Sequence, residues 1–369
     1  MVTESCAACA TPPNEGTGIG MTSSTLTAPP SRRGSDYARL SRRIAEAGLL
    51  VRRPGWYAAR IGLTLGAFLA GWAVVVAVGD SWAQLLLAVG MAVATTQVAF
   101  LGHDAGHRQM FRRRGASELA GLIAGNLAVG LSYGWWVDKH NRHHANPNHT
   151  DEDPDVGAGA LVWTYEQAAA TRGVGRWLAR RQAWLFFPLL LLEGLALHVA
   201  SVRALTGREN GRWTTPVRHR AVEALLLLAH AVGYLGLLFA VMSPGKALLF
   251  VAVHQGLWGL YMGCAFAPNH KGMPMPTAED DLDFLRKQVL TSRNVRGGRF
   301  VDVALGALNY QIEHHLFPNM PRANLRRARP IVRAYCAEQG IPYAETGLVE
   351  SYRQALAHLH EVGRPLRAG

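Results

Sequence analysis

The chain has few charged residues, few cysteines and a shortage of acidic side chains. Charged residues make up 17% of its 369 positions, below the share of about 25% that is typical of soluble proteins. Four cysteines are too few for a disulfide-stabilised scaffold, and a hydrophobic share of 49% excludes a disordered protein. Only 26 acidic residues oppose 38 Lys and Arg, which leaves a charge of +12. That charge is compatible with a nucleic acid, an anionic membrane surface or an acidic substrate.

Familiar local signals are also missing. No apolar segment follows Met1, so we expect no cleaved secretory signal. Cys6 and Cys9 form a C-x-x-C pair, but no second Cys or His pair at zinc spacing follows it. Residues 1–34 are rich in Ser, Thr, Pro and Gly and predict a disordered N-terminal tail.

Long apolar runs are what the chain has instead. A bilayer core of about 30 Å needs about 20 apolar residues in a helix, at 1.5 Å per residue. Runs of this kind occur at residues 58–79, 82–102, 221–242 and 246–267. Stretches such as Val74, Val75 and Val76 leave no polar face, which a helix of a soluble bundle would need. The sequence therefore predicts an all-α polytopic membrane protein with four transmembrane helices.

Two further apolar stretches are not expected to cross the membrane. Residues 183–205 contain Glu193 and His198, and an ionisable side chain inside lipid costs about 2.5–3.5 kcal/mol. Arginines also flank both ends of this run, so we expect an interfacial or re-entrant helix. Residues 116–133 are punctuated by glycine, and their apolar core is too short to span.

Histidines gather in three short motifs, H-D-A-G-H, H-N-R-H-H and Q-I-E-H-H. The motifs contain His103, His107, His140, His143, His144, His314 and His315. Positions i, i+3 and i+4 of a helix share one face, so each motif presents its imidazoles in one direction. One zinc ion takes three or four ligands. Seven imidazoles therefore favour two first-row metal ions.

The distribution of basic residues and the number of spans predict which side of the membrane these motifs face. All three must lie on one side of the membrane to share metal ions, so an even number of spans separates the second from the third. With four spans, both termini and all three motifs lie on one face. Lys246 is the only basic residue in the turns of the opposite face, at 79–82 and 243–246. The positive-inside rule then makes the face with the motifs cytoplasmic, with a helical cap that holds the metal site, and the one-sided charge argues against a nucleic-acid partner.

The motifs resemble those of the membrane-bound fatty acid desaturase family. The third motif, Q-I-E-H-H-L-F-P at 311–318, is similar to that of the front-end and acyl-CoA or acyl-lipid branches, with Gln311 in place of a histidine. Trp135-Trp136, the second motif and D-E-D-P-D at 151–155 also match. The resemblance covers roughly residues 55–335. It implies two irons, O₂ as co-substrate and a vicinal dehydrogenation of a fatty acyl chain in lipid metabolism.

The resemblance also implies further site residues. Family members carry eight or nine histidine ligands, and His270, in P-N-H-K-G beyond the fourth span, stands where the family has the extra one. His149 is a second candidate. The implied iron ligands are His103, His107, His140, His143, His144, His270, His314 and His315, with no other catalytic residue. Water-mediated or supporting roles are expected for Gln311 and Asn269, and for Asp104, Asp153 and Glu313 as acceptors of imidazole N–H groups.

The sequence gives less direct evidence about the substrate site and about the source of electrons. Trp258, Gly259 and Tyr261 in the fourth span either line an acyl tunnel or serve helix packing, and His198, His230 and His254 are expected to be satisfied by neighbours. The basic surface could attract a CoA or phospholipid headgroup or anionic lipid. The sequence has no His-Pro-Gly-Gly segment of a fused cytochrome b5 domain, no iron–sulfur cysteine spacing and no G-x-G-x-x-G. We therefore expect electrons from a separate ferredoxin or cytochrome and its reductase.

Two alternative functions compete with the acyl desaturase. A membrane hydroxylase or ketolase of alkanes, sphingolipids or carotenoids shares histidine motifs, but Q-I-E-H-H argues against it. A histidine-rich metal transporter would place histidines and acids within its spans, whereas these motifs lie at or beyond span ends. The expected organisation is a tail at 1–34, a desaturase domain at 35–345 and a C-terminal helical tail at 346–369.

Overall fold

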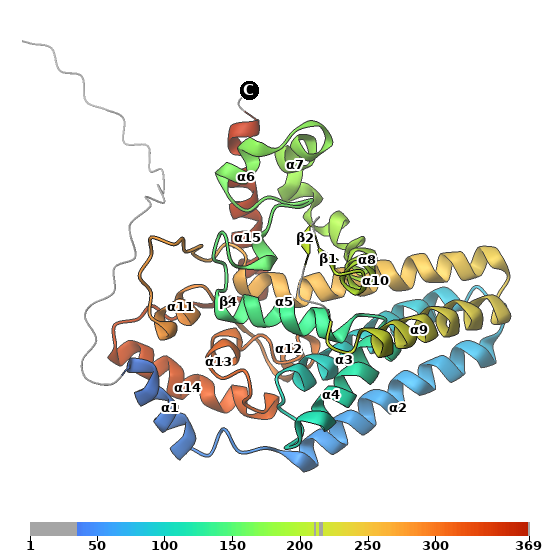
Figure 1. Cartoon of the computed structure of the whole chain (residues 1–369), viewed down its shortest axis with the longest axis horizontal. Helices are drawn as coiled ribbons and strands as arrows, with labels where there is room; N and C mark the ends of the chain where they lie inside the picture. The colour runs from blue at the N-terminus through green and yellow to red at the C-terminus, as the bar shows by residue number, and fades with distance from the viewer. Residues whose placement is uncertain (1–34, 210–211, 214–216, 368–369) are drawn as a thin grey trace, which may run out of the picture.

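The computed structural model describes residues 35–209, 212–213 and 217–367. The predicted N-terminal tail and the Cys6–Cys9 pair lie outside these residues. Within the described part of the chain, helices dominate, and the strands form two sheets of two strands each. Figure 1 shows a group of long helices that projects from a cap of shorter ones.

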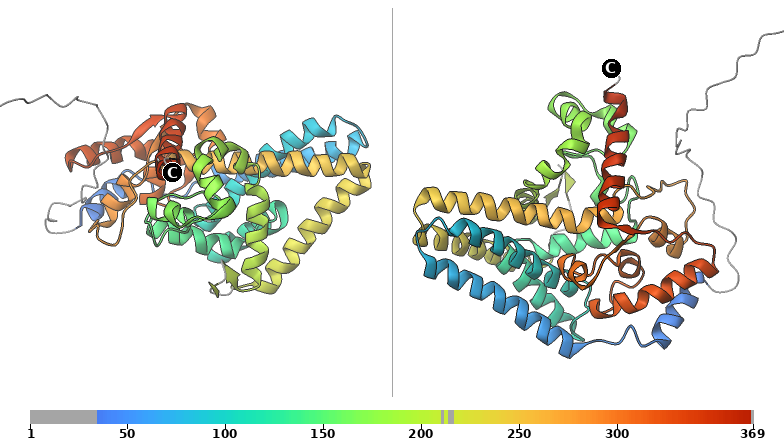
Figure 2. Two further views of the ribbon diagram at one scale, coloured as in Figure 1. Left: turned by 90° about the horizontal axis from the view of Figure 1, so that it is seen from above. Right: turned by 180° about the vertical axis from the view of Figure 1, so that it is seen from behind.

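Four long helices form the projecting group, and both views of Figure 2 show them extending from the same side of the cap. They are α2 (Pro54–Val78), α3 (Gln84–Gly106), α9 (Arg220–Val241) and α10 (Pro244–His270). Each is long and apolar enough to cross a membrane. Proline at the first position of α2 and α10 fixes a backbone angle that suits a helix start. The four predicted spans are confirmed.

The apolar run at 183–205 is divided between two helices. These are α7 (Gly173–Leu190) and α8 (Glu193–Leu205), which meet at an angle of 82°. Pro188 lies in the last turn of α7 and removes a backbone N–H that a continuing helix would need. A Cβ on Gly259 of α10 would lie 2.4 Å from the Gly194 nitrogen of α8, so these two helices pack with their backbones in close contact. The bend excludes a straight crossing, in agreement with the expectation for this run.

The short stretch at 116–133 forms a hairpin that turns back. Helix α4 (Arg114–Leu122) continues as the π-helix η1 (Ile123–Val129), which ends at Gly130 with a φ of +83°. The chain then returns in α5 (Tyr133–Ala145), whose first turn is capped by the Ser132 hydroxyl accepting from the Trp135 N–H. We call this segment the α4–η1 hairpin, because the chain reverses at its end, at Gly130. It packs against α3 and α9, and α5 carries the second histidine motif.

Shorter elements build the cap around the third motif. They are α1 (Asp36–Glu46), η2 (Pro154–Val156), α6 (Tyr165–Ala170), β1 (Arg208–Glu209), β2 (Arg212–Trp213), α11 (Phe284–Leu290), β3 (Asn294–Arg296), α12 (Arg299–Ala304), α13 (Gln311–Leu316), α14 (Arg322–Glu338), β4 (Glu345–Gly347), α15 (Leu348–Val362) and η3 (Arg364–Leu366). An apolar core that includes Leu40, Leu316 and Val332 joins α1, α13 and α14.

The C-terminal segment is tied into this cap. Strand β4 pairs in parallel with β3, Asn294 opposite Glu345, and it straddles the boundary predicted between residues 345 and 346. Helix α15 packs against α7 and α10. The last helix therefore shares contacts with both the cap and the membrane helices.

Candidate metal centre

The eight histidines singled out by sequence come together from four places in the fold. His103 is in the last turn of α3 and His107 follows it, and the second motif lies on α5. His270 ends α10, and the third motif lies on α13. The first histidine group is His103, His107, His140 and His314, each with a ring nitrogen within 4.8 Å of the others. The second histidine group, defined by the same distance, is His143, His270 and His315.

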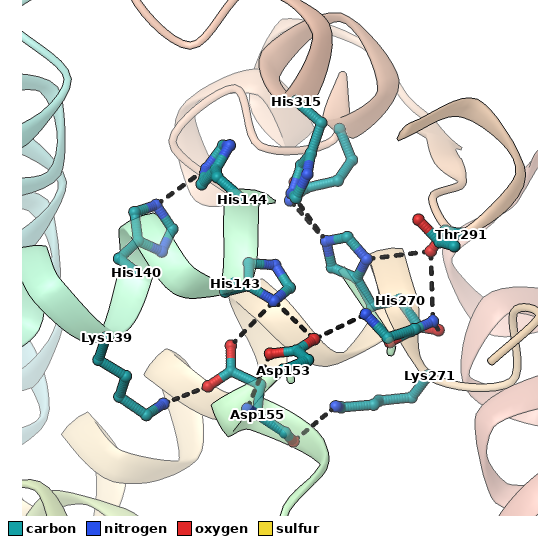
Figure 3. A network of polar contacts seen from close by, with 12 residues as sticks. Lys139, His140, His143, His144, Asp153, Asp155, His270, Lys271, Thr291 and His315 are labelled. Carbon is teal, nitrogen blue, oxygen red and sulfur yellow. Dashed lines mark hydrogen bonds and ion pairs between the residues drawn. The ribbon is translucent and has the colours of Figure 1, made fainter. Parts of the chain in front are cut away.

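His144 lies between the two groups. Its Nε2 is 3.1 Å from Nε2 of His140 in the first group. Its ring stacks on that of His315 in the second group, with centroids 4.1 Å apart. The two groups therefore form one continuous cluster, and Figure 3 shows the side of it around His143, His270 and His315.

Several ring nitrogens face one another at hydrogen-bond distance, and they cannot all be satisfied by hydrogen bonds among themselves. His140 Nε2 lies 2.9 Å from His107 Nε2 and 3.1 Å from His144 Nε2, although one ring nitrogen can donate only one proton. Buried nitrogens without a hydrogen-bond partner among the described residues include His103 Nε2 and both ring nitrogens of His314. Such a convergence of unshared lone pairs fits bound metal ions, and imidazole suits first-row metals.

Burial keeps these rings in the state that binds metal. It lowers the pKa of five imidazoles well below 6.5, and the neighbouring histidines lower it further; these are His107, His140, His144, His314 and His315. A neutral imidazole offers a lone pair, whereas a protonated one does not. These five rings therefore stay neutral at physiological pH.

Hydrogen bonds on the outer edge fix the orientation of the second histidine group. The Nδ1 of His143 donates to Asp153 Oδ2 at 2.9 Å, and that of His270 donates to the Thr291 carbonyl oxygen at 3.1 Å. The Nδ1 of His315 donates to Gln288 Oε1 at 2.9 Å. Each bond leaves Nε2 free to face the cluster, which is the usual arrangement around a metal-binding histidine. Asp153 was singled out by sequence as an acceptor of an imidazole N–H, whereas Gln288 and Thr291 were not.

Charged side chains lie close to the Nδ1 edge of the His143 ring (Figure 3). The Asp155 carboxylate lies 3.5 Å from His143 Nδ1 and pairs with Lys139. Lys271 Nζ donates to the Asp155 carbonyl oxygen at 2.9 Å. Burial opposes ionisation of Asp155, but the charges of Lys139 and Lys271 outweigh it and lower the pKa of this carboxyl. A fixed negative charge therefore stands next to the second histidine group.

Asp104 and Glu313 were expected to accept hydrogen bonds from imidazoles, but they bond to other partners. Asp104 Oδ1 lies 3.6 Å from His103 Nδ1, beyond hydrogen-bond distance, and Asp104 instead pairs with Arg322 at 2.7 Å. Glu313 accepts from Asn294 Nδ2 and from the Tyr343 hydroxyl, both at 2.7 Å. Glu313 precedes His314 by one position, and this offset of about 100° on a helix turns it away from the cluster. Burial raises the pKa of Glu313 to about 7.

The remaining polar candidates lie at the second histidine group or outside it. Gln311 Nε2 lies 2.9 Å from His270 Nε2, and Asn269 Nδ2 donates to Gln311 Oε1 at 3.3 Å. Asn269 Oδ1 is buried without a hydrogen-bond partner among the described residues. His149 belongs to neither histidine group and accepts from the Asp151 N–H.

An apolar cavity adjoins the first histidine group at His103. It is lined by Ala99, Phe100, Gly102, His103, Gly125, Val129, Leu131, Tyr133, Trp136, Met262 and Phe266. Three residues expected as substrate-lining candidates are not among these. Gly259 packs on Gly194, Trp258 lies against the His198 ring, and the Tyr261 hydroxyl donates to the Ala304 carbonyl oxygen. Trp258, Gly259 and Tyr261 therefore do not line this cavity, and α10 reaches it through Met262 and Phe266.

Comparison with known proteins agrees with this arrangement. Residues 80–347 match the family described as fatty acid desaturase. The chain is 31% identical to the acyl-lipid (9-3)-desaturase of Physcomitrium patens, over 76% of this chain and 53% of that protein. It is 32% identical to the Delta(5) fatty acid desaturase fat-4 of Caenorhabditis elegans, over 69% of this chain and 58% of that protein. Identity to fatty acid desaturase 3 of Bos taurus is 30%, over 84% and 68%.

The chain spans a little over half the length of the first two of these relatives. The match nevertheless includes all three histidine motifs and both of the membrane helices α9 and α10. The family generally uses a di-iron centre, and the two histidine groups could bind metal. With four apolar helices long enough to cross a membrane, the chain is a membrane protein that belongs to the fatty acid desaturase family.

Proposed function

We propose that this protein is an O₂-dependent di-iron desaturase that introduces a double bond into a fatty acyl chain carried by CoA or by a lipid. The observation that carries the proposal is the apolar cavity that reaches His103, at the edge of two adjoining histidine groups. The printed names of the relatives describe desaturases of acyl lipids and fatty acids, which supports the same class of substrate here.

The two histidine groups would each hold one iron. His103, His107, His140 and His314 would hold the first, and His143, His270 and His315 the second, with His144 between them. Bound iron, with O₂, two electrons and two protons, supplies the oxidising power to remove two hydrogens from neighbouring methylenes and form two water molecules. No side-chain base can take a proton from such a methylene.

The protein's own residues position the chain and keep the site dry. Leu131, Val129 and Phe266 surround the cavity with apolar surface, which favours an acyl chain and excludes water. His103 lies in the wall of that cavity and in the first histidine group, so a chain held there lies next to that group. Asp153, Gln288 and the Thr291 carbonyl hold the rings of the second group in a fixed orientation.

The proposal also includes an electron donor and an orientation of the protein in the membrane. The electron donor is a separate ferredoxin or cytochrome with its own reductase. The histidine cap and both ends of the chain lie on the cytoplasmic side, which the basic charge of the cap supports. The far turns contain Lys246, which is paired with Asp80 at 3.2 Å and so adds little charge to that side.

Expression in a host with simple lipids tests the proposal. Gas chromatography with double-bond mapping should find a new unsaturated fatty acid, and the variants His143→Ala and His314→Ala should lack it. His360→Ala is the matched control, because His360 is exposed on α15, far along the chain from the motifs. A hydroxylated product, or no new product in a host with a working electron donor, would contradict the proposed desaturase.

A further inference from the structure

A second cavity opens at the foot of α2. It has a volume of about 660 Å³, and six arginines line it. They are Arg53, Arg60, Arg299, Arg322, Arg326 and Arg327. Among the described residues that line this arginine cavity, Asp302 is the only acid, and none of them lines the apolar cavity at His103. The arginine cavity is therefore distinct from the proposed path of the acyl chain.

The fold neutralises only part of this charge. Arg322 pairs with Asp104 at 2.7 Å, and Arg326 reaches Asp302 at 3.4 Å. The side chains of Arg299 and Arg327, both exposed, have no ion pair or hydrogen bond within the described part of the chain.

The other two arginines contact neutral groups. Arg53 Nε donates to Asn324 Oδ1 at 3.1 Å, and Arg60 donates to the Gln97 side chain. Amide oxygens do not cancel the charge of a guanidinium. Within the described ranges of the chain, four of the six positive charges around the cavity therefore lack an acidic partner.

Arg60 is the most informative of the six. It lies within the first two turns of α2, a membrane-spanning helix. Its Nε is buried without a hydrogen-bond partner among the described residues. An ionisable residue within a span costs free energy and usually marks a functional site. An anion in the cavity would offset that cost.

Apolar side chains beside the cavity place it at the level of the lipid headgroups. Trp56 at the start of α2 is 38% exposed, and Phe300 and Val303 of α12 are 83% and 51% exposed. Aromatic side chains of this kind gather where the bilayer meets water. An acidic protein in solution would leave Phe300 in water, whereas a bilayer covers it. The surroundings therefore favour a lipid over a soluble partner.

We propose that the arginine cavity binds the phosphate-bearing headgroup of an anionic phospholipid. Arginine presents paired N–H donors that match the oxygens of a phosphate group. The lipid's acyl chains would extend along α2 and the exposed apolar face of α12. Such a site holds the cap against the membrane and does not depend on the proposed desaturase activity.

Lipid titration of the purified full-length protein tests this site. Thermal unfolding in detergent is followed as short-chain phosphatidylglycerol is added, with phosphatidylcholine and inorganic pyrophosphate in parallel. The half-saturating concentration of phosphatidylglycerol should rise about tenfold or more in the double variant Arg299→Gln/Arg327→Gln. Both side chains are exposed and form no ion pair or hydrogen bond with a described residue, so this variant should unfold at the wild-type temperature without lipid.

A charge-matched variant controls for general attraction. Arg42 and Arg333 are exposed and do not line the cavity, and Arg42→Gln/Arg333→Gln should bind phosphatidylglycerol within about twofold of wild type. Equal losses in the two double variants, or no loss in the first, would overturn the proposal. Saturation by pyrophosphate at the same concentration as by phosphatidylglycerol would show a site for free phosphate and would also overturn it.

Discussion

Single residues explain why the histidine cluster is ready to bind metal. Burial lowers the pKa of imidazoles such as His140 and His314 and so keeps these rings neutral. Hydrogen bonds from Nδ1 of His143, His270 and His315 to outer partners leave Nε2 for the cluster. Removing an outer partner should therefore weaken metal binding without removing a ligand.

Asp153 gives the first test at this scale. In Asp153→Asn, His143 loses a charged acceptor, and outer partners of this kind contribute about 10–100-fold to metal affinity. We expect iron to leave the variant at a chelator concentration about tenfold or more below that needed for wild type. Asp151→Asn, two residues away and exposed, should behave as wild type. Equal iron retention in Asp153→Asn and wild type would contradict the role of this hydrogen bond.

Glu313 gives a pH-dependent test. Burial raises its pKa from 4.5 to about 7, so the folded protein holds the proton more tightly than the unfolded chain. The stabilisation is complete below pH 4.5 and is lost as pH rises through 7. Relative to Glu313→Gln, the wild type should lose stability between pH 5 and pH 8, by about 3 kcal/mol at most.

Melting temperatures of wild type and Glu313→Gln in detergent, measured across this pH range, provide the comparison. The two curves should diverge as pH rises, because the glutamine cannot ionise. A constant difference between them at pH 5 and pH 8 would show that Glu313 is not protonated in the folded state.

Residue-level prediction succeeded where spacing carries the information. Histidines such as His140 and His144 are four positions apart, and a helix brings such positions to one face, so the sequence reveals them. The Thr291 carbonyl left no signal, because every residue has a backbone carbonyl. Asp104 and Glu313 are adjacent to ligand candidates in sequence, but the structure pairs them with Arg322 and with Asn294 and Tyr343.

At the scale of elements, the α4–η1 hairpin is the wall that shapes the apolar cavity. It contributes Gly125 and Val129, and Leu131 follows it. The carbonyl oxygens of Leu127 and Gly130 accept from His230 and His198, as expected for histidines satisfied by neighbours. The sequence predicted a stretch too short to span but not the π-helix, since that distortion depends on partners from distant helices.

Glu223 of α9 fixes the same hairpin. Its buried carboxylate accepts from Asn126 Nδ2 at 3.0 Å, the Ser132 hydroxyl at 2.7 Å and the Gly134 N–H at 3.1 Å. In Glu223→Ala these donors lose their partner, so the cavity wall should loosen. We expect a mixture of double-bond positions in the product, with the iron content unchanged.

Double-bond mapping of the products checks this expectation. Glu223→Gln, which keeps an acceptor oxygen, should give a product distribution closer to that of wild type. A single unchanged double-bond position in Glu223→Ala, at any level of activity, would show that the hairpin does not set the position of the chain.

At the scale of the whole molecule, hydropathy and charge were enough to predict the membrane helices. Glu193 predicted that residues 183–205 form an interfacial or re-entrant helix, and the structure bends there by 82°. The arrangement of the cap was not predicted. Contacts such as the pairing of β3 with β4 and the packing of α1 on α14 join segments far apart in sequence, and local patterns carry no information about them.

Orientation in the membrane is testable by thiol labelling. In a background with Cys6, Cys9 and Cys264 replaced by serine, Gly245→Cys in the far turn should react with an impermeant reagent added outside intact cells. Arg42→Cys on α1 should react only after the cells are opened. Cys336 should stay silent at pH 8, because burial raises its pKa to about 12. Labelling of Arg42→Cys from outside would place the cap on the wrong side of the membrane.

The two histidine groups are expected to hold two irons in one centre. Elemental analysis of the purified protein, with protein quantified independently, measures the iron content. We expect close to two iron atoms per chain, and a marked loss of iron in His314→Ala compared with His360→Ala. A single metal ion per chain, or zinc in place of iron, would contradict it.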